Sequence, residues 1–334
     1  MTIRRHSRGK KPNTRAMSHK KIVVIGGGTG VFTILSALKH DFDRLTAIVT
    51  MADDGGSTGI LREEFGILPP GDLRRALIAL SHADNKMLAD LFAYRFQEGA
   101  GLSGHNFGNL FITALHRLTN DFERAIAEAG KMLQVRGQVI PVTLTSTQLV
   151  AELADGQVVR GETNLDIPKH DGHLRISRIW LQPTASANPN AIRAIKEADL
   201  VIIGPGDLFT SIIPNLLVAG IPEALRTTRA KVAYFVNVMT KLGETHGFSA
   251  SDFVRNIEAY LGTGVLDYVV LNDSKPAPAR LKPYIREHAE FVEPDTEAIH
   301  LKKGGVPLAV DLIRSKGYIR HDPKKVLRVV KMIV

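Results

Sequence analysis

The sequence predicts an α/β protein with a Rossmann-like, doubly wound and mostly parallel sheet that carries a small antiparallel β insertion. Short runs of apolar, β-branched residues alternate with stretches of helical spacing along most of the chain, as in parallel α/β folds. Two of these runs end in glycine-rich turns that lead into a helix, at Gly26–Gly30 and Gly204–Gly206. Only residues 145–183 break this rhythm, with an alternating apolar and polar pattern that is typical of an antiparallel hairpin.

The first half of the chain supplies two predicted strands and five predicted helices. The strands are the apolar runs at residues 21–26 and 44–50. Asp72 and Asp121 lie near the start of two helices, where a side-chain acceptor is favoured. Helical spacing is found at residues 31–40, 71–81, 85–96, 104–118 and 121–133.

The second half begins with the insertion and then returns to alternating strands and helices. Asp155-Gly156 lies between two alternating runs and predicts the turn of a hairpin. Further strands are predicted at residues 198–203, 230–240 and 266–273, and further helices at residues 208–220, 249–261 and 322–334.

Composition indicates a globular protein without thiol chemistry. The chain has 334 residues, is 44% hydrophobic and has no cysteine, which excludes disulfides, cysteine zinc sites and a thiol nucleophile. No apolar run is long enough to span a bilayer, so we expect a cytoplasmic protein without a membrane span. The length suits one large domain or two modest ones, and we expect residues 21–334 to form the ligand-binding domain.

Positive charge is concentrated at the N-terminus. The whole chain carries a net charge of +9, and residues 1–21 hold eight basic residues and no acidic one. We predict that residues 1–20 form a basic, disordered tail, or that Met17 is the true start. A tail of this kind can contact nucleic acid or anionic lipid, but the nearly neutral body makes a nucleic-acid partner an unfavoured reading.

The first glycine-rich turn is a candidate phosphate-binding loop. Ligands of open parallel sheets bind outside the carboxyl ends of the strands, so residues that directly follow a strand are candidates for a site. Glycines let backbone N–H groups approach a phosphate, and the following helix presents its positive N-terminus. Val31 stands where the third glycine of a G-x-G-x-x-G motif would be, which leaves a tight turn as the alternative. The candidate residues are Gly26, Gly27, Gly28, Thr29 and Gly30.

The second strand is followed by two adjacent aspartates and a glycine- and hydroxyl-rich stretch. An acid at this place binds a ribose hydroxyl in Rossmann proteins, and two carboxylates can also hold Mg²⁺. The alternative is that one aspartate caps a helix and the other is solvated. The candidate residues are Asp53, Asp54, Gly55, Gly56, Ser57 and Thr58.

The remaining candidates lie at a second strand–glycine–helix junction and in polar turns. The junction offers Gly204, Pro205, Gly206, Asp207, Thr210 and Ser211. At the start of another predicted helix, His105, Asn106 and Asn109 can bond a base, sugar or phosphate, although a lone histidine is more often structural. Asn237 ends a later strand and is either a ligand contact or a plain loop residue.

Six motifs in order resemble the gluconeogenesis factor family, the YvcK-type or UPF0052-like proteins related to CofD, the 2-phospho-lactate transferase. They are VIGGGTG, ADDGGSTG, PPGDLRRAL, GHNFGNL, GPGDLFTSIIPNLLV and FVNVMTKLGET, and the resemblance extends from about residue 21 to 334. It implies a CofD-like, Rossmann-like, single-domain bacterial protein that binds UDP-sugars such as UDP-N-acetylglucosamine. It further implies a need for the protein in cell shape and peptidoglycan synthesis on gluconeogenic carbon sources. Tyr284 and Arg320 match positions that this family uses on the nucleotide-sugar.

The same resemblance leaves an enzymatic alternative open. A CofD-like protein would join a phospho-lactate group to a deazaflavin alcohol, using a GDP-activated donor and Mg²⁺, with Asp53 and Asp54 as metal-binding or hydroxyl-activating carboxylates. We expect a binding regulator instead, with no obligatory cofactor, an unidentified protein partner and room for a homo-oligomer. A dinucleotide oxidoreductase is the weakest reading, because the glycine spacing does not match and no catalytic set accompanies it.

Overall fold

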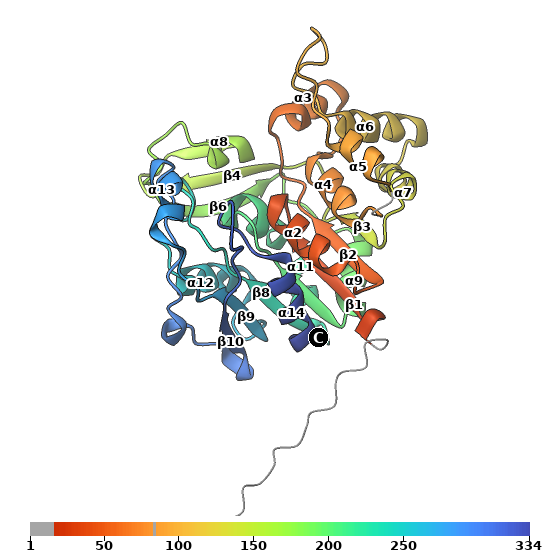
Figure 1. Ribbon diagram of the computed structural model, residues 1–334. Helices are drawn as coiled ribbons and strands as arrows, with labels where there is room; N and C mark the ends of the chain where they lie inside the picture. Colours follow the sequence, from red (N-terminus) through yellow and green to blue (C-terminus); the bar gives the residue numbers. More distant parts are fainter. Residues whose placement is uncertain (1–16, 83–84) are drawn as a thin grey trace, which may run out of the picture.

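A seven-stranded parallel sheet forms the centre of the computed structural model, which describes residues 17–82 and 85–334 (Figure 1). Its strand order is β10-β9-β8-β7-β1-β2-β3. The strands are β1 (Lys21–Gly26), β2 (Arg44–Val49), β3 (Gln138–Pro141), β7 (Leu200–Ile203), β8 (Lys231–Phe235), β9 (Tyr268–Asn272) and β10 (Val306–Val310).

The order of the strands reverses at β1, which therefore marks where a ligand is expected. From β1 the chain moves to β2 on one side, and the later strands β7, β8 and β9 add on the other side. β1 pairs with both neighbours in parallel register, with Val24 opposite Ala47 of β2 and Ile202 of β7. These side chains are buried on both faces of the sheet, which explains the continuous apolar runs of the sequence. A reversal of this kind opens a crevice at the carboxyl ends of the strands.

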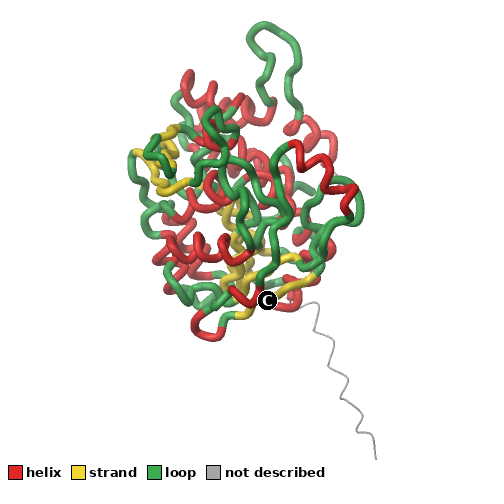
Figure 2. The backbone as a smooth tube through the Cα atoms, turned by 90° about the vertical axis from the view of Figure 1, so that its left-hand side faces the viewer, coloured by secondary structure: helices red, strands yellow, loops and turns green. Residues whose placement is uncertain are grey.

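Helices cover both faces of the sheet. α2, α4 and α14 pack together on one face, and α9, α11 and α12 pack on the other (Figure 1). The connection between α5 and α6 projects from the body in both Figure 1 and Figure 2. The helices are α2 (Gly28–Leu38), α3 (Gly56–Phe65), α4 (Gly71–Leu80), α5 (Lys86–Ala93), α6 (Phe107–Thr119), α7 (Phe122–Met132), α8 (Glu162–Asp166), α9 (Pro189–Glu197), α10 (Ile213–Leu216), α11 (Ile221–Thr227), α12 (Ala250–Leu261), α13 (Pro278–Arg286) and α14 (Pro323–Ile333).

The predicted antiparallel insertion is present and forms a sheet of its own. Its order is β5-β4-β6, built from β4 (Gln148–Leu153), β5 (Val158–Arg160) and β6 (Ile176–Gln182). The Asp155-Gly156 turn joins β4 to β5, and Gly156 adopts a positive φ of 87° that suits glycine. The short helix α8 follows β5 and returns the chain toward the main sheet.

Several elements differ from the sequence prediction or were absent from it, among them the helices α3, α9 and α11. β3 and β10 are edge strands of only four and five residues, too short to give a clear period. α13 contains Pro283 inside the helix, which hides its helical pattern. The helix predicted at 208–220 opens as a π-helical turn, Leu208–Ile212, and continues as the four-residue α10.

The start of the described chain contacts the body. Met17 packs against the main core, and Lys20 donates to Asp199 over 3.0 Å, so residues 17–20 are ordered rather than part of a tail. The rest of the predicted tail lies outside the described residues. Within the described ranges, no helix is both long and apolar enough to cross a bilayer.

Candidate functional site

A cavity of about 450 Å³ lies at the carboxyl ends of β1, β2, β7 and β8. It collects residues from both glycine-rich junctions, from the stretch after β2, from α4 and α8, and from the segment before α14. Predicted candidates in its wall are Gly27, Gly28, Thr29, Gly30, Asp53, Gly55, Gly56, Ser57, Thr58, Asn109, Pro205, Gly206, Asp207, Thr210, Ser211, Asn237 and Arg320. Gly26, Asp54, His105, Asn106, Gly204 and Tyr284 stand behind the wall or beside it.

The two glycine-rich junctions touch each other at Gly30 and Pro205, which leaves no room for a side chain at position 30. A Cβ at Gly30 would lie 1.9 Å from the carbonyl oxygen of Pro205, and a Cβ at Gly27 would lie 2.5 Å from Oδ2 of Asp72. Gly28 has a φ of +61°, which an L side chain adopts only with strain. The backbone of both junctions therefore faces the same cavity without side chains in between.

Asn237 fixes the second junction. Its Oδ1 accepts a hydrogen bond from the backbone N–H of Gly206 over 3.1 Å, and its Nδ2 donates to the carbonyl of Gly206 over 2.8 Å. Gly204 does not line the cavity, and its backbone N–H donates to the carbonyl oxygen of Ile25 in β1 over 2.9 Å. Asn237 thus both lines the cavity and positions the loop.

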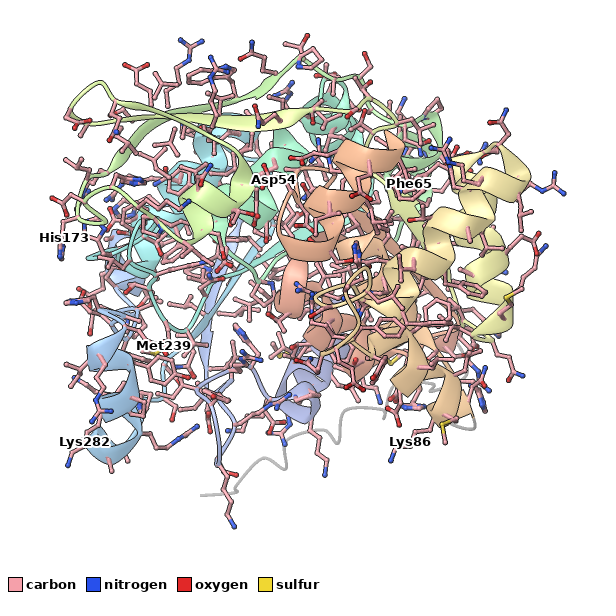
Figure 3. All side chains as sticks on the ribbon, turned by 90° about the horizontal axis from the view of Figure 1, so that it is seen from above. Asp54, Phe65, Lys86, His173, Met239 and Lys282 are labelled. Carbon is pink, nitrogen blue, oxygen red and sulfur yellow. The ribbon has the colours of Figure 1, made fainter. Side chains whose placement is uncertain are left out.

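Asp53 and Asp54 point in different directions. Asp53 lines the cavity, and its Oδ1 accepts from the N–H of Gly55 over 3.0 Å. Both carboxylate oxygens of Asp54 accept backbone N–H groups at the start of α8, from Glu162 over 3.1 Å and from Thr163 over 2.9 Å. Figure 3 shows Asp54 between α3 and α8. Asp54 therefore caps a helix of the insertion, which matches one of the alternatives open for this pair.

Ser57 and Thr58 are held by two polar side chains and one backbone N–H group from the start of α6. Oγ of Ser57 lies 3.2 Å from Nδ1 of His105, and Nδ2 of Asn109 donates to Oγ of Ser57 and to Oγ1 of Thr58, each over 3.4 Å. Asn106 caps α6 by accepting from the N–H of Asn109. Because His105 and Asn106 lie outside the cavity wall, their role here is to position the hydroxyl groups that line it.

Tyr284 does not line the cavity, but it contacts the segment that carries Arg320. Its Oη accepts from the backbone N–H of Ile319 over 2.8 Å, and its ring packs with Val238, Ile313 and Ile319. Arg320 lines the cavity, next to Ile319. The structure therefore gives Tyr284 the task of holding the arginine-bearing segment in place.

Several wall residues were missed by the sequence reasoning. Asp72, Arg74 and Arg75 lie within PPGDLRRAL, so this motif carried a usable signal. Arg95 and Glu162 come from the α5–α6 connection and the insertion, and nothing local in the sequence places them at the cavity. The full set of these residues is Thr33, Thr50, Gly71, Asp72, Arg74, Arg75, Arg95, Glu162, Thr163, Asp166, Ile167, Val238, Met239, Ile319 and His321.

Two carboxyl groups in the cavity, those of Asp72 and Glu162, have raised pKa values. Burial, followed by repulsion from Asp53, raises the pKa of Asp72 to about 6. Burial, followed by repulsion from Asp53 and Asp166, raises the pKa of Glu162 to about 9. Arg75 balances part of this charge, with Nη1 3.4 Å from Oδ1 of Asp72. The cavity thus combines arginines with carboxyl groups and can meet both an anion and a set of hydroxyl groups.

A second group of three carboxylates lies at the end of the cavity and surrounds a lysine. The carboxylates of Asp166, Asp207 and Glu244 approach within 4.8 Å of one another. Nζ of Lys241 contacts all three, at 3.1 Å from Asp207 and 3.3 Å from Glu244, with Asp166 also bonded. Although burial alone would lower the pKa of Lys241, these carboxylates, Glu244 first, raise it. The ammonium group therefore takes the place that a metal ion would need.

The structure offers a different set of possible Mg²⁺ ligands from the predicted pair of Asp53 and Asp54. Both carboxylate oxygens of Asp54 are used by the α8 cap. Apart from the acids paired with Lys241, the carboxyl groups that face the cavity are Asp53, Asp72 and Glu162, and carboxylate oxygens are suitable Mg²⁺ ligands. Asp53 and Asp72 would hold such an ion together with the phosphate oxygens of a ligand.

Comparison with known proteins decides the family. The profile of the family described as 2-phospho-L-lactate transferase CofD matches residues 22–312. The gluconeogenesis factor of Bacillus subtilis is 44% identical over 310 residues, which cover 92% of this chain and 95% of that protein. This chain belongs to the gluconeogenesis factor family, within the CofD family. A further family member, from a Nostoc species, is 49% identical over 312 residues, covering 92% of this chain and 67% of the relative.

The gluconeogenesis factor family also includes a solved structure with this fold. A crystal structure described as a member of the UPF0052 family, from Bacillus halodurans, superimposes with a TM-score of 0.87 at 39% identity. It covers 94% of this chain and 99% of that protein. The Rossmann-like sheet and its antiparallel insertion are therefore the fold of the family.

Proposed function

We propose that this gluconeogenesis factor family member binds a nucleotide-sugar of the UDP-N-acetylglucosamine type in the cavity and acts as a regulator. The observation that carries the proposal is the meeting of both glycine-rich junctions with Arg75, Arg95 and Arg320 in one cavity. Exposed backbone N–H groups and arginines are the two standard ways in which proteins bind a diphosphate. A volume of about 450 Å³ suits a ligand of this size.

The cavity wall offers groups for each part of such a ligand. Val238, Met239 and Ile319 supply apolar surface beside Arg320, which suits the flat face of a nucleobase. Asp53, Glu162 and hydroxyl groups also line the cavity and suit the hydroxyls of a sugar. The diphosphate would lie against the glycine-rich junctions.

We base the regulatory role on the family resemblance rather than on a catalytic set. We propose that ligand binding reports nucleotide-sugar supply to a protein partner in the cytoplasm and supports cell shape and peptidoglycan synthesis on gluconeogenic carbon sources. The pair with the geometry nearest to a nucleophile and base, Ser57 and His105, is used to organise the cavity wall.

A CofD-type transferase is the second candidate, favoured by the family match and by the acids in the cavity. The acceptor alcohol would form a bond to phosphorus and lose its proton to a carboxylate such as Asp53. The bond from phosphorus to the leaving guanosine monophosphate would break. Such a transfer needs mainly positioning and charge neutralisation, which Mg²⁺ on Asp53 and Asp72 would supply.

Calorimetry on one arginine variant tests the binding proposal. Arg320→Ala should weaken UDP-N-acetylglucosamine binding at least tenfold, because a charged contact to the diphosphate is lost. Arg328→Ala is the matched control, since Arg328 is an exposed arginine of α14 outside the cavity wall. Equal affinity of the wild type and Arg320→Ala would remove Arg320 from the site.

A further inference from the structure

Three histidines from distant parts of the sequence meet outside the cavity. His173 belongs to the insertion, His246 to the loop after β8, and His288 to the loop after α13. The ring centres of His173 and His246 are 5.4 Å apart, and those of His173 and His288 are 5.9 Å apart. None of the three lines the cavity. Figure 3 places His173 at the periphery of the molecule.

Hydrogen bonds of the backbone connect the three segments that carry these histidines. The N–H of Gly243 donates to the carbonyl of Gly172 over 2.9 Å, which ties the His246 loop to the residue before His173. The N–H of Thr240 donates to the carbonyl of Glu290 over 2.7 Å, and the N–H of Glu290 donates to Oγ1 of Thr240 over 2.8 Å. The histidine backbones are therefore held by the fold, which is the support that a metal site requires.

One histidine nitrogen is buried without a partner. Nδ1 of His246 has no hydrogen-bond partner among the described residues, although a buried polar atom normally has one. This buried ring nitrogen without a partner is available as a ligand atom.

We propose that His173, His246 and His288 bind a divalent transition metal ion, with Zn²⁺ as the representative. Zn–N bonds of about 2.0–2.1 Å place the centres of two imidazoles on one tetrahedral ion about 5 Å apart. The distances from the His173 ring to the His246 and His288 rings, 5.4 Å and 5.9 Å, are slightly longer. The rings now stand edge to face, at 80° and 82°. Rotation about the Cβ–Cγ bond turns the nitrogens and leaves each ring centre nearly in place, and this torsion is soft in histidine.

The surroundings suit a neutral three-histidine site with an open position. Imidazole ligands favour zinc, copper and nickel, whereas Mg²⁺ prefers oxygen. The exposed carboxylate of Glu290 offsets the charge of the ion and of Arg175, and the exposure of His173 and His288 leaves room for water as a fourth ligand. An ion here would cross-link the insertion to the two loops that follow β8 and α13. The site is independent of the proposed nucleotide-sugar binding.

Calorimetric titration with ZnCl₂ tests this site, using the full chain without an affinity tag after chelator treatment. We expect one saturable site and a higher melting temperature with Zn²⁺. His173→Gln and His288→Gln should each weaken binding at least tenfold. Both side chains are exposed, so these variants should fold. His246→Gln should abolish the site, and His40→Gln, an exposed histidine elsewhere, should bind as the wild type does.

Two results would overturn the zinc proposal. The first is the absence of saturable Zn²⁺ binding to the wild type. The second is binding that is unchanged in His173→Gln and His288→Gln, with loss in Asp166→Asn instead, which would place the ion at the carboxylates around Lys241. Neither result bears on nucleotide-sugar binding, which is measured separately in the cavity.

Discussion

The charge on one carboxyl group in the cavity changes the pKa values of the neighbouring carboxyl groups. Glu162 comes from the insertion and meets the field of Asp53 and Asp166, while Asp53 also raises the pKa of Asp72. The acids are packed closely enough that they cannot all ionise without cost in a site of low polarity. A bound cation, a ligand with hydroxyl donors, or protonation each relieves that cost.

The free energy of unfolding should depend on pH through Glu162. Its pKa is about 9 in the folded state and near 4.5 when unfolded, so the folded state binds more protons between these values. Stability contributed by this group is present below pH 4.5 and falls as pH rises toward 9. Glu162→Gln should therefore be more stable than the wild type at pH 8, by on the order of 1 kcal/mol, and equal to it near pH 4.

Urea unfolding at the two pH values measures this difference. An equal effect of Glu162→Gln at both pH values would show that the glutamine acts through packing and that the carboxyl group is not strained by its neighbours.

The contact between the two glycine-rich junctions should not tolerate a methyl group. Gly30→Ala places a Cβ 1.9 Å from the carbonyl oxygen of Pro205. Because this oxygen is a backbone atom, it can move away only if the loop shifts, which costs free energy. We expect a loss of about 1–3 kcal/mol in the free energy of unfolding. Gly101→Ala is the control, since no atom lies within 4 Å of a Cβ there. A thermally unchanged Gly30→Ala protein would contradict the observed loop contact.

At the scale of elements, the insertion is joined to the cavity by α8. Asp54 caps this helix from the stretch after β2, and Asp166 at its other end bonds Lys241. Glu162, Thr163 and Asp166 then form one wall of the cavity. The small β sheet therefore places α8 beside the cavity.

Substitutions of the adjacent residues Asp53 and Asp54 should have different effects on stability and on ligand affinity. Asp54→Ala should lower the free energy of unfolding by about 1 kcal/mol through loss of the cap, with a smaller effect on ligand affinity. Asp53→Ala should chiefly weaken binding of UDP-N-acetylglucosamine. Chemical unfolding and calorimetry on both variants separate the roles. Loss of affinity confined to Asp54→Ala would reverse the assignment.

The sequence predicts those elements whose pattern is local. Buried runs identified β1, β2, β7, β8 and β9, and glycine junctions were visible because each directly follows a strand. The orientation of Asp54 was not predictable, because it depends on backbone groups more than 100 residues away. Arg95 and Glu162 reach the cavity only through tertiary packing, and β3 and β10 are too short to show a period.

For the whole molecule, the reversal of strand order at β1 brings the chemistry together. Residues from Gly27 to His321 meet in one cavity because β2 and β7 lie on either side of β1. The same cavity suits a nucleotide-sugar regulator and a phosphoryl-type transferase. The two functions therefore differ in which nucleotide the cavity binds. The fold and the family membership are common to both.

The measurement that tests this account most directly is calorimetric titration of the full chain with UDP-N-acetylglucosamine and, separately, with GDP and Mg²⁺. The account predicts saturable binding of the UDP-sugar with one site per chain and no response to GDP with Mg²⁺. Binding of GDP that requires Mg²⁺, without UDP-sugar binding, would contradict it and would identify the cavity as the site of a CofD-type transferase.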